Sequence, residues 1–152
     1  MQGILLGEEV QEGWFFYLNE SLITWNSYKE KRVALSSCEA EFMAATAAAM
    51  QGLWLRSLLA EITGLPPQTV KLYVDNNSAI ALMKNVVFHG RSKHIDTKYH
   101  FIRECVERCQ FQVKRVSTEE QKADALTKAL PAVKLAVMRH LLGVRDLSAC
   151  QN

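Results

Sequence analysis

Three carboxylates stand at the ends of predicted helices and strands. Glu41 follows the start of a long helical segment, Asp75 ends a short strand, and Asp124 comes early in a later helix. No pair of histidines or cysteines accompanies them, and carboxylates alone suit hard cations such as Mg²⁺ rather than zinc. Glu41 and Asp75 also have structural alternatives, as a first-turn glutamate favoured by the helix dipole and as a turn or N-cap aspartate. The residue types indicate a magnesium-type site and leave these alternatives open.

The segment that carries Glu41 has clear helix signals. Ser36-Ser37-Cys38-Glu39 matches a capping box, with Ser36 at the N-cap and Glu39 three residues later. The alanine-rich run that follows predicts a helix to about Ile62. Glu39 is thereby assigned to the cap, whereas Glu41 lies on another face. That face continues with small residues that would let the helix approach a sheet closely, namely Ala45, Ala48 and Gly52.

Alternation and turn residues predict the remaining elements. Residues 14–18 and 21–25 form a predicted β-hairpin around Asn19-Glu20. Residues 69–75 alternate with a period of two, which predicts a strand, and Asn76-Asn77-Ser78 offers N-caps for a short helix. A helix is expected at residues 94–108 and a peripheral strand at 111–117. A second capping box at Thr118 predicts a helix that carries Asp124. The last expected element is an amphipathic helix at 133–144, with Gly143 as its C-cap.

The composition predicts one globular domain without membrane attachment. Of the 152 residues, 49% are hydrophobic and 22% are charged, which is ordinary for a soluble protein. No apolar run reaches the roughly 20 residues that cross a bilayer, and the N-terminal segment lacks the features of a secretory signal. An intracellular location, in the cytoplasm or nucleus, is therefore expected. The cysteines lack the second ligand pair of a zinc site and are expected to be free thiols: Cys38, Cys105, Cys109 and Cys150.

The net charge of +2 is small, but basic residues concentrate in one stretch. Between Lys84 and Arg108, six lysines and arginines stand against three acidic residues. A local cluster of this kind can bind the phosphate backbone of a nucleic acid. A solvated helix face is the alternative, and charge alone does not separate the two.

Five strings of residues together resemble one known family. The similarity runs from about Gly13 to Leu147 and is carried by long, specific segments. They are GWFFYLNESLITW, VALSSCEAEFMAATAAAMQGLWL, LYVDNNSAI, FHGRSKHIDTKYHFIRECVER and TEEQKADALTKAL. These segments resemble the C-terminal region of plant copia-type retrotransposon Pol polyproteins. In that family the region is a ribonuclease-H-like domain, attached to reverse transcriptase, which degrades the RNA strand of RNA–DNA hybrids.

The resemblance implies an α/β fold, in which helices flank a five-stranded mixed sheet, and an active site of four acidic residues that bind two Mg²⁺ (or Mn²⁺) ions. Three of the four match by motif: Glu41 in EFMAATAAA, Asp75 in YVDN and Asp124 in KADALTK. Two such metals clamp the attacking water and the leaving oxygen of a phosphodiester. Hybrid recognition is expected through backbone and 2′-hydroxyl contacts. The candidate phosphate-contacting residues are Arg91, Lys93 and Lys98.

The chain departs from the family at its N-terminal end. The family's first aspartate belongs to a central strand and would fall before Met1, so the resemblance implies an N-terminally truncated domain. Residues 1–12 are expected to be a divergent leader, 13–147 the domain and 148–152 a tail. The first central strand is then either missing or replaced by residues 3–7, and metal binding is expected to be weak or lost without the bridging aspartate. Glu8 and Glu9 are the nearest possible substitutes.

Two hypotheses follow. The first is a ribonuclease-H-type endonuclease with Glu41, Asp75 and Asp124 as catalytic residues and metal ligands. The second is a catalytically inactive, domesticated domain that binds nucleic acid or a protein. The expected partners are an RNA–DNA hybrid and the reverse transcriptase domain of the parent polyprotein, and the sequence leaves the oligomeric state open.

Overall fold

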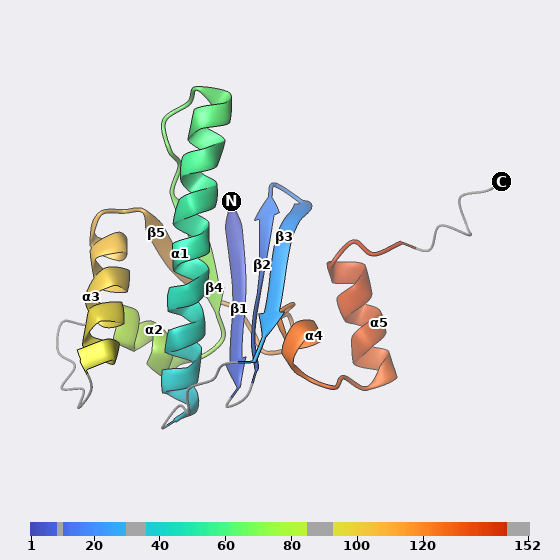
Figure 1. The fold of residues 1–152 in the computed structure, drawn as a ribbon. Helices are drawn as coiled ribbons and strands as arrows, with labels where there is room; N and C mark the ends of the chain where they lie inside the picture. The colour runs from blue at the N-terminus through green and yellow to red at the C-terminus, as the bar shows by residue number, and fades with distance from the viewer. Residues whose placement is uncertain (9–10, 30–35, 85–92, 146–152) are drawn as a thin grey trace.

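A computed structural model describes residues 1–8, 11–29, 36–84 and 93–145, and for residues 2–8, 11 and 93–96 only the backbone is described. Its sheet has five strands in the order β3-β2-β1-β4-β5 (Figure 1). The strands are β1 (Gln2–Glu8), β2 (Gln11–Leu18), β3 (Ser21–Tyr28), β4 (Val70–Val74) and β5 (Phe111–Arg115). The helices are α1 (Ser37–Thr63), α2 (Asn77–Lys84), α3 (Lys93–Glu107), α4 (Asp124–Thr127) and α5 (Ala132–Leu141). None of these described helices is long and apolar enough to span a membrane.

The central position of the sheet is filled by β1, from the segment expected to be a divergent leader. It pairs antiparallel with β2 from Gln2↔Tyr17 to Glu8↔Gln11. On its other side it pairs parallel with β4, from Gln2↔Lys71 to Ile4↔Tyr73. Of the two alternatives for the first central strand, missing or replaced by residues 3–7, the structure shows the second. The backbone donors and acceptors of β2 and β4 that would lack partners in a four-stranded remnant are paired within the chain.

The hairpin and the edge strand agree with the sequence patterns. β2 and β3 pair antiparallel around a turn in which Asn19 has a positive φ of 55°, a conformation that asparagine tolerates better than most residues. β5 pairs with β4 alone and is therefore at the edge, as predicted. Its Phe111 and Val113 are buried, so one face of this strand is apolar.

The helix that carries Glu41 begins and ends where its capping residues predict. The Ser36 hydroxyl accepts a hydrogen bond from the Glu39 amide at 3.1 Å, and Gly64 ends the helix with a φ of 67°. A side-chain cap at the N-terminus satisfies one of the amides that have no partner within the helix. The start of α1, and with it the position of Glu41, is thus set locally.

Replacing Ser36 with alanine is expected to lower the free energy of unfolding by about 1 kcal/mol, because the Glu39 amide loses its partner. Urea unfolding of the two proteins measures this loss. Ser37→Ala, one residue further along and exposed, serves as the matched control and is expected to change stability by less than about 0.5 kcal/mol. Equal losses for both variants would show that the cap is not responsible.

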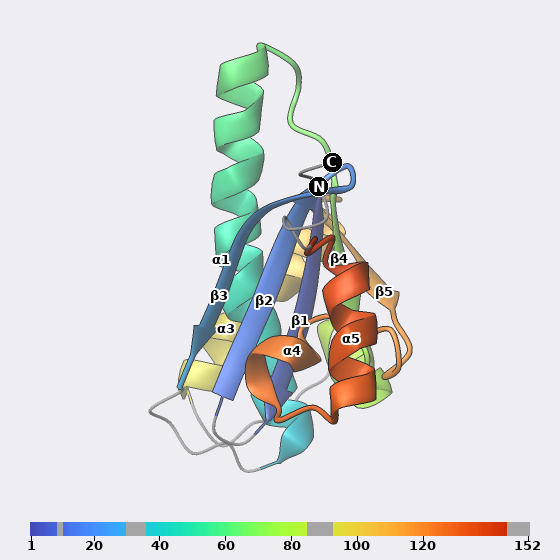
Figure 2. The same ribbon diagram turned by 90° about the vertical axis from the view of Figure 1, so that its right-hand side faces the viewer.

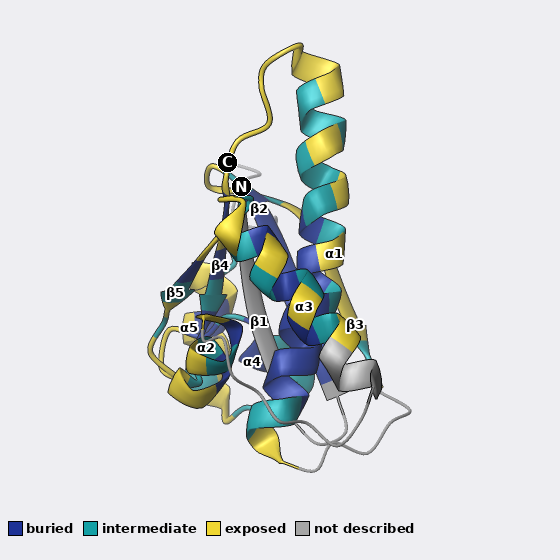
Figure 3. Ribbon diagram, turned by 90° about the vertical axis from the view of Figure 1, so that its left-hand side faces the viewer, coloured by how far each residue is buried: buried dark blue, intermediate teal, exposed yellow. Residues whose placement is uncertain are grey.

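Helices cover both faces of the sheet. Figures 1 and 2 show α1, α2 and α3 on one face and α4 and α5 on the other. The larger core lies under the first group, where Phe16, Phe42 and Leu72 are buried, and Figure 3 shows that the buried part of α1 is its first half. The smaller core is built around Phe15, Tyr17 and Ala123 on the opposite face.

Small residues bring α1 close to the sheet, as the sequence predicts. Ala45 and Ala48 are fully buried. A Cβ atom added to Gly52 would lie 3.1 Å from the Phe111 ring and 3.2 Å from the Phe16 ring, which is tighter than an ordinary van der Waals contact. This close packing fixes α1 over the centre of the sheet, with the start of the helix near the ends of β1 and β4 (Figure 1).

The prediction that a helix begins at Thr118 is wrong. Residues 118–120 form a turn, in which the Ser117 hydroxyl bonds the Glu120 carboxylate at 3.2 Å, and α4 begins only at Asp124. Gln121 and Ala123 are fully buried, so this segment is drawn onto the sheet. Tertiary burial therefore overrides a local capping pattern.

The C-terminal helix and the cysteines agree with the sequence in part. α5 is shorter than the predicted 133–144, and of its expected apolar stripe only Met138 is buried. Gly143 follows it with a φ of 75°. Among the described cysteines, Cys38, Cys105 and Cys109 are free thiols as predicted, while Cys150 lies outside the described residues.

Candidate active site

The three predicted carboxylates come from elements that meet at one end of the sheet. β1 and β4 run parallel, so their carboxyl ends lie at the same edge, and α1 begins at that edge (Figure 1). Side chains at the carboxyl ends of parallel strands commonly build ligand sites in α/β folds. Glu41 is in the first turns of α1, Asp75 directly follows β4, and Asp124 is the first residue of α4.

Glu41 and Asp75 form a close carboxyl pair. Only 5% of Glu41 is exposed, and its Oε1 atom is buried without a hydrogen-bond partner. Burial, a hydrogen bond shared with the Asp75 side chain and the negative charge of Asp75 together raise the pKa of Glu41 to about 9. The Asp75 backbone amide and the nearby Lys128 ammonium act in the opposite direction. The pair therefore holds a proton at neutral pH unless a cation compensates its charge.

In the structure Asp75 does not cap α2, which was its alternative, structural role. The N-terminal turn of α2 is capped by Asn76, whose Oδ1 accepts from the Ser78 amide at 2.9 Å and from the Ala79 amide at 3.0 Å. With the cap supplied by the next residue, the Asp75 carboxyl is directed to Glu41 instead. The short helix thus places Asp75 beside the start of α1.

Asp124 is fully buried and is contacted by two lysines that sequence reasoning missed. Lys134 Nζ lies 2.8 Å from its Oδ2, and Lys128 Nζ lies 3.3 Å from its Oδ1. The second contact is an ion pair without hydrogen-bond geometry, since Oδ1 has no hydrogen-bond partner. Lys128 stands four residues after Asp124, a spacing that places two residues on one helix face. Lys134 belongs to α5, and no sequence pattern links it to Asp124.

The close approach of α4 to the sheet brings Asp124 into this region. A Cβ atom added to Gly13 would lie 2.9 Å from Leu126 Cβ and 3.0 Å from Thr127 Cγ2. The Ser27 hydroxyl also donates to the Leu126 carbonyl at 2.9 Å. A glycine in β2 therefore leaves the space that α4 occupies.

The structure unites two of the predicted ligands and keeps the third apart. Over the described part of the chain, no three His, Cys, Asp or Glu side chains are grouped closely enough to hold one metal ion. Glu41 contacts Asp75, while Asp124 pairs with Lys128, whose charge also acts on Glu41. The single acidic residue of β1 is Glu8, its last residue, opposite Gln11. Glu9 lies outside the described residues.

Two of the three predicted nucleic-acid-binding residues lie in the first half of α3, whose start is at the same end of the molecule as the start of α1 (Figure 1). Lys93 is the first residue of α3 and Lys98 is partly buried, whereas Arg91 lies outside the described residues. Later basic residues are paired: Arg103 of α3 lies 2.7 Å from Glu107, and Arg108, which directly follows α3, lies 2.6 Å from Glu104. The basic stretch is therefore partly neutralised in its second half.

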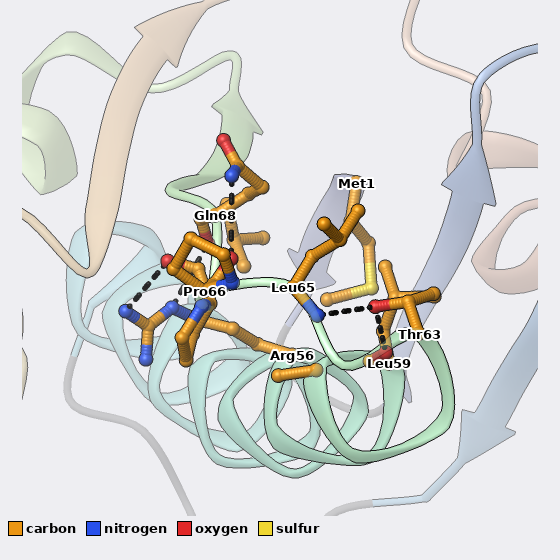
Figure 4. Close-up of a pocket in the computed structure, with 10 residues that line it drawn as sticks. Met1, Arg56, Leu59, Thr63, Leu65, Pro66 and Gln68 are labelled. Atoms are coloured by element: carbon orange, nitrogen blue, oxygen red, sulfur yellow. Dashed lines mark hydrogen bonds between the residues drawn. The ribbon is translucent and has the colours of Figure 1, made fainter.

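An apolar pocket lies at the opposite end of α1 (Figure 4). At about 1.5 Å per residue, Thr63 in its wall is about 33 Å along the helix from Glu41. Arg56 closes one side by donating to the carbonyls of Gln68 at 2.9 Å and Pro67 at 3.3 Å. These bonds hold the proline-containing loop against α1, and the pocket has no part in the carboxylate site.

Comparisons with known proteins show which proteins this chain is similar to. The chain is 40% identical over 146 residues to the retrovirus-related Pol polyprotein from transposon TNT 1-94 of Nicotiana tabacum, covering 96% of the chain and 11% of that protein. It is 39% identical over 132 residues to the Pol polyprotein from transposon RE2 of Arabidopsis thaliana, covering 87% of the chain and 9% of that protein. This chain is a homologue of one segment of plant retrotransposon Pol polyproteins. It spans about a tenth of their length.

Solved structures show the fold of this Pol-related chain. RNase H1 isolated from compost matches with a TM-score of 0.54 and 14% identity, covering 82% of the chain and 89% of that structure. RNase H1 from Halobacterium salinarum matches with a TM-score of 0.50 and 14% identity, covering 82% and 92%. The chain has the ribonuclease-H-like fold. No family model matches it.

Proposed function

We propose that this chain is a copia-type ribonuclease H domain, which hydrolyses the RNA strand of RNA–DNA hybrids with a divalent cation held by Glu41 and Asp75. The ribonuclease-H-like fold and the homology to Pol polyproteins support a nuclease-type domain. The single observation that carries the finer proposal is the close pair formed by the buried Glu41 carboxyl, near the start of α1, and the partly buried Asp75, after the end of β4. The reverse transcriptase domain of the parent polyprotein is the proposed partner.

The carboxyl pair fits one divalent cation. Glu41 Oε1 is buried and has no hydrogen-bond partner, and the neighbouring Asp75 makes a second negative charge unfavourable. Mg²⁺ or Mn²⁺ prefers carboxylate oxygens. Either ion would give the Oε1 atom a partner and would also compensate the negative charges of the two carboxylates. A cation held by Glu41 and Asp75 would supply a nucleophilic water near neutral pH and would stabilise the charge that develops on the phosphate.

The other residues of the site would bind and orient the hybrid. Asp124 is the third carboxylate of the region, and the positive charge of Lys128, which acts on Glu41, would attract a phosphate group of the hybrid. Arg91, Lys93 and Lys98 are proposed to contact the phosphate backbone, which makes binding dependent on salt. Recognition through backbone and 2′-hydroxyl groups predicts little dependence on base sequence.

A second candidate function is a catalytically inactive module that binds nucleic acid or a protein. The observation in its favour is the composition of β1, whose residues QGILLGE contain no aspartate at the centre of the sheet. The family's first catalytic aspartate belongs to that strand. Without a bridging ligand, a clamp of two metals is not expected to form.

Cleavage of a labelled RNA–DNA hybrid in Mg²⁺ separates the two functions. We expect Asp75→Asn to lower the rate on the order of 100-fold and to leave hybrid binding within about 3-fold, because the substitution removes a ligand charge and keeps the side-chain shape. Glu61→Gln, an exposed carboxylate near the other end of α1, is the matched control and should retain the full rate. Equal absence of cleavage in all three proteins, with hybrid binding retained, supports the binding module instead.

A further inference from the structure

We propose that Lys128 and Lys134 take the place of a second cation, so that the site binds one divalent ion between Glu41 and Asp75 and Asp124 is not a metal ligand. This inference rests on the proposed function, because it concerns the cation that the nuclease would use. It assigns to two lysines a role that no motif of the sequence indicates.

The contacts of Asp124 carry the inference. Its side chain has no exposed surface, yet both of its carboxylate oxygens face an ammonium group, at 2.8 Å from Lys134 and 3.3 Å from Lys128. A buried carboxylate needs a partner of opposite charge, and here the chain supplies two. We call the two ion pairs of Asp124 with Lys128 and Lys134 the lysine clamp. Because one lysine follows α4 and the other belongs to α5, the lysine clamp forms only when α5 is folded against α4.

A metal ion and this lysine clamp exclude one another. Inner coordination of Mg²⁺ requires carboxylate oxygens in a near-octahedral arrangement at about 2.0–2.1 Å. At Asp124 the Lys134 ammonium donates to Oδ2 and the Lys128 ammonium lies 3.3 Å from Oδ1 as an ion pair, and both positive charges repel a dication at short range. Binding a metal there would require both ammonium groups to leave the fully buried Asp124 carboxylate, although the side chains of Lys128 and Lys134 are themselves only partly buried.

The charges of the site favour one dication over two. Glu41, Asp75 and Asp124 contribute three potential negative charges, and Lys128 and Lys134 contribute two positive charges. The arithmetic, 3 − 2 = 1, leaves one uncompensated negative charge, which lies at the Glu41–Asp75 pair. One divalent ion brings the sum from −1 to +1, and a second would raise it to +3, so a second ion is disfavoured.

Binding of Mn²⁺ alone tests the proposal without any measurement of cleavage. We expect calorimetric titration of the wild type to show one Mn²⁺ per chain, and Asp75→Asn to lose it. The double variant Lys128→Met, Lys134→Met frees Asp124 and is expected to bind two. Two ions in the wild type, or one in a folded double variant, would overturn the clamp, whereas no ion in the wild type overturns the proposed function.

Single variants keep the test decisive where the double variant fails to fold. Lys128→Met leaves the 2.8 Å pair of Lys134 with Asp124 and removes a positive charge near Glu41. The variant is expected to bind Mn²⁺ about 10-fold more tightly, because a positive charge that repels the ion has been removed. Lys128→Arg should leave the affinity within about 3-fold, and so should Lys71→Met, an exposed lysine in β4. Unchanged or weaker binding by Lys128→Met would overturn the proposal.

Discussion

Glu41→Gln is expected to stabilise the folded chain by about 2 kcal/mol at pH 7 to 8 in the absence of divalent cations. Burial and Asp75 raise the pKa of Glu41 from its ordinary value of 4.5 to about 9. Between these two values the unfolded chain loses the Glu41 proton and the folded chain keeps it. The folded state therefore binds more protons, and its stability falls as pH rises through this window.

The sign of the effect follows from the two limits. Below pH 4.5 the carboxyl is protonated in both states, so its contribution to stability is fully present. Above pH 9 it is ionised in both states, and the whole contribution has been lost. Glutamine carries no charge at any pH, so the variant keeps the stability of the protonated form and loses this part of the pH dependence.

Urea unfolding at pH 5, 6, 7 and 8 in a chelating buffer measures the difference. The wild-type curve should fall relative to the Glu41→Gln curve as pH increases, and Mg²⁺ should restore the wild type more than the variant. Glu39→Gln, two residues earlier in α1, is the matched control and should keep the wild-type slope, because Glu41 is intact. Parallel curves for the wild type and Glu41→Gln would contradict the prediction.

Phe16→Ala is expected to lower the free energy of unfolding by about 3–5 kcal/mol. The ring has no exposed surface, packs edge-on against Trp14 with their ring centroids 5.3 Å apart, and lies under Gly52 of α1. Removing it leaves a cavity between the sheet and the helix that carries Glu41. The surrounding backbone cannot collapse into that space, because β2 is paired on both sides.

Thermal unfolding provides the measurement, with an expected fall in Tm of about 10 °C for a chain of this size. Trp25→Ala in the neighbouring β3 removes a larger ring that is 61% exposed, and it is expected to cost less than about 1 kcal/mol. The comparison separates burial from aromatic character. Similar losses for the two variants would mean that Phe16 does not anchor α1 to the sheet.

Local signals in the sequence determined the elements that carry the site. The Ser36 cap and the Gly64 terminus define α1, alternation defines β4, and Asn76 caps α2, because each depends on neighbouring residues in the chain. The motifs around Glu41 and Asp75 also indicated the family, and the homology to Pol polyproteins confirms it. Where a local signal competed with burial, as at Thr118, it failed, because Gln121 and Ala123 gain more from packing on the sheet than the capping box offers.

The tertiary structure alone decided how the site is assembled. The sequence allowed residues 3–7 either to fill the central strand or to leave it empty, and only pairing with both β2 and β4 made β1 part of the sheet. Three carboxylates were predicted as one ligand set. Glu41 and Asp75 meet because α1 begins where β4 ends, while Asp124 faces lysines of which one belongs to another helix. Sequence spacing specifies which residues share one helix or strand, but charge pairs between elements depend on how those elements pack.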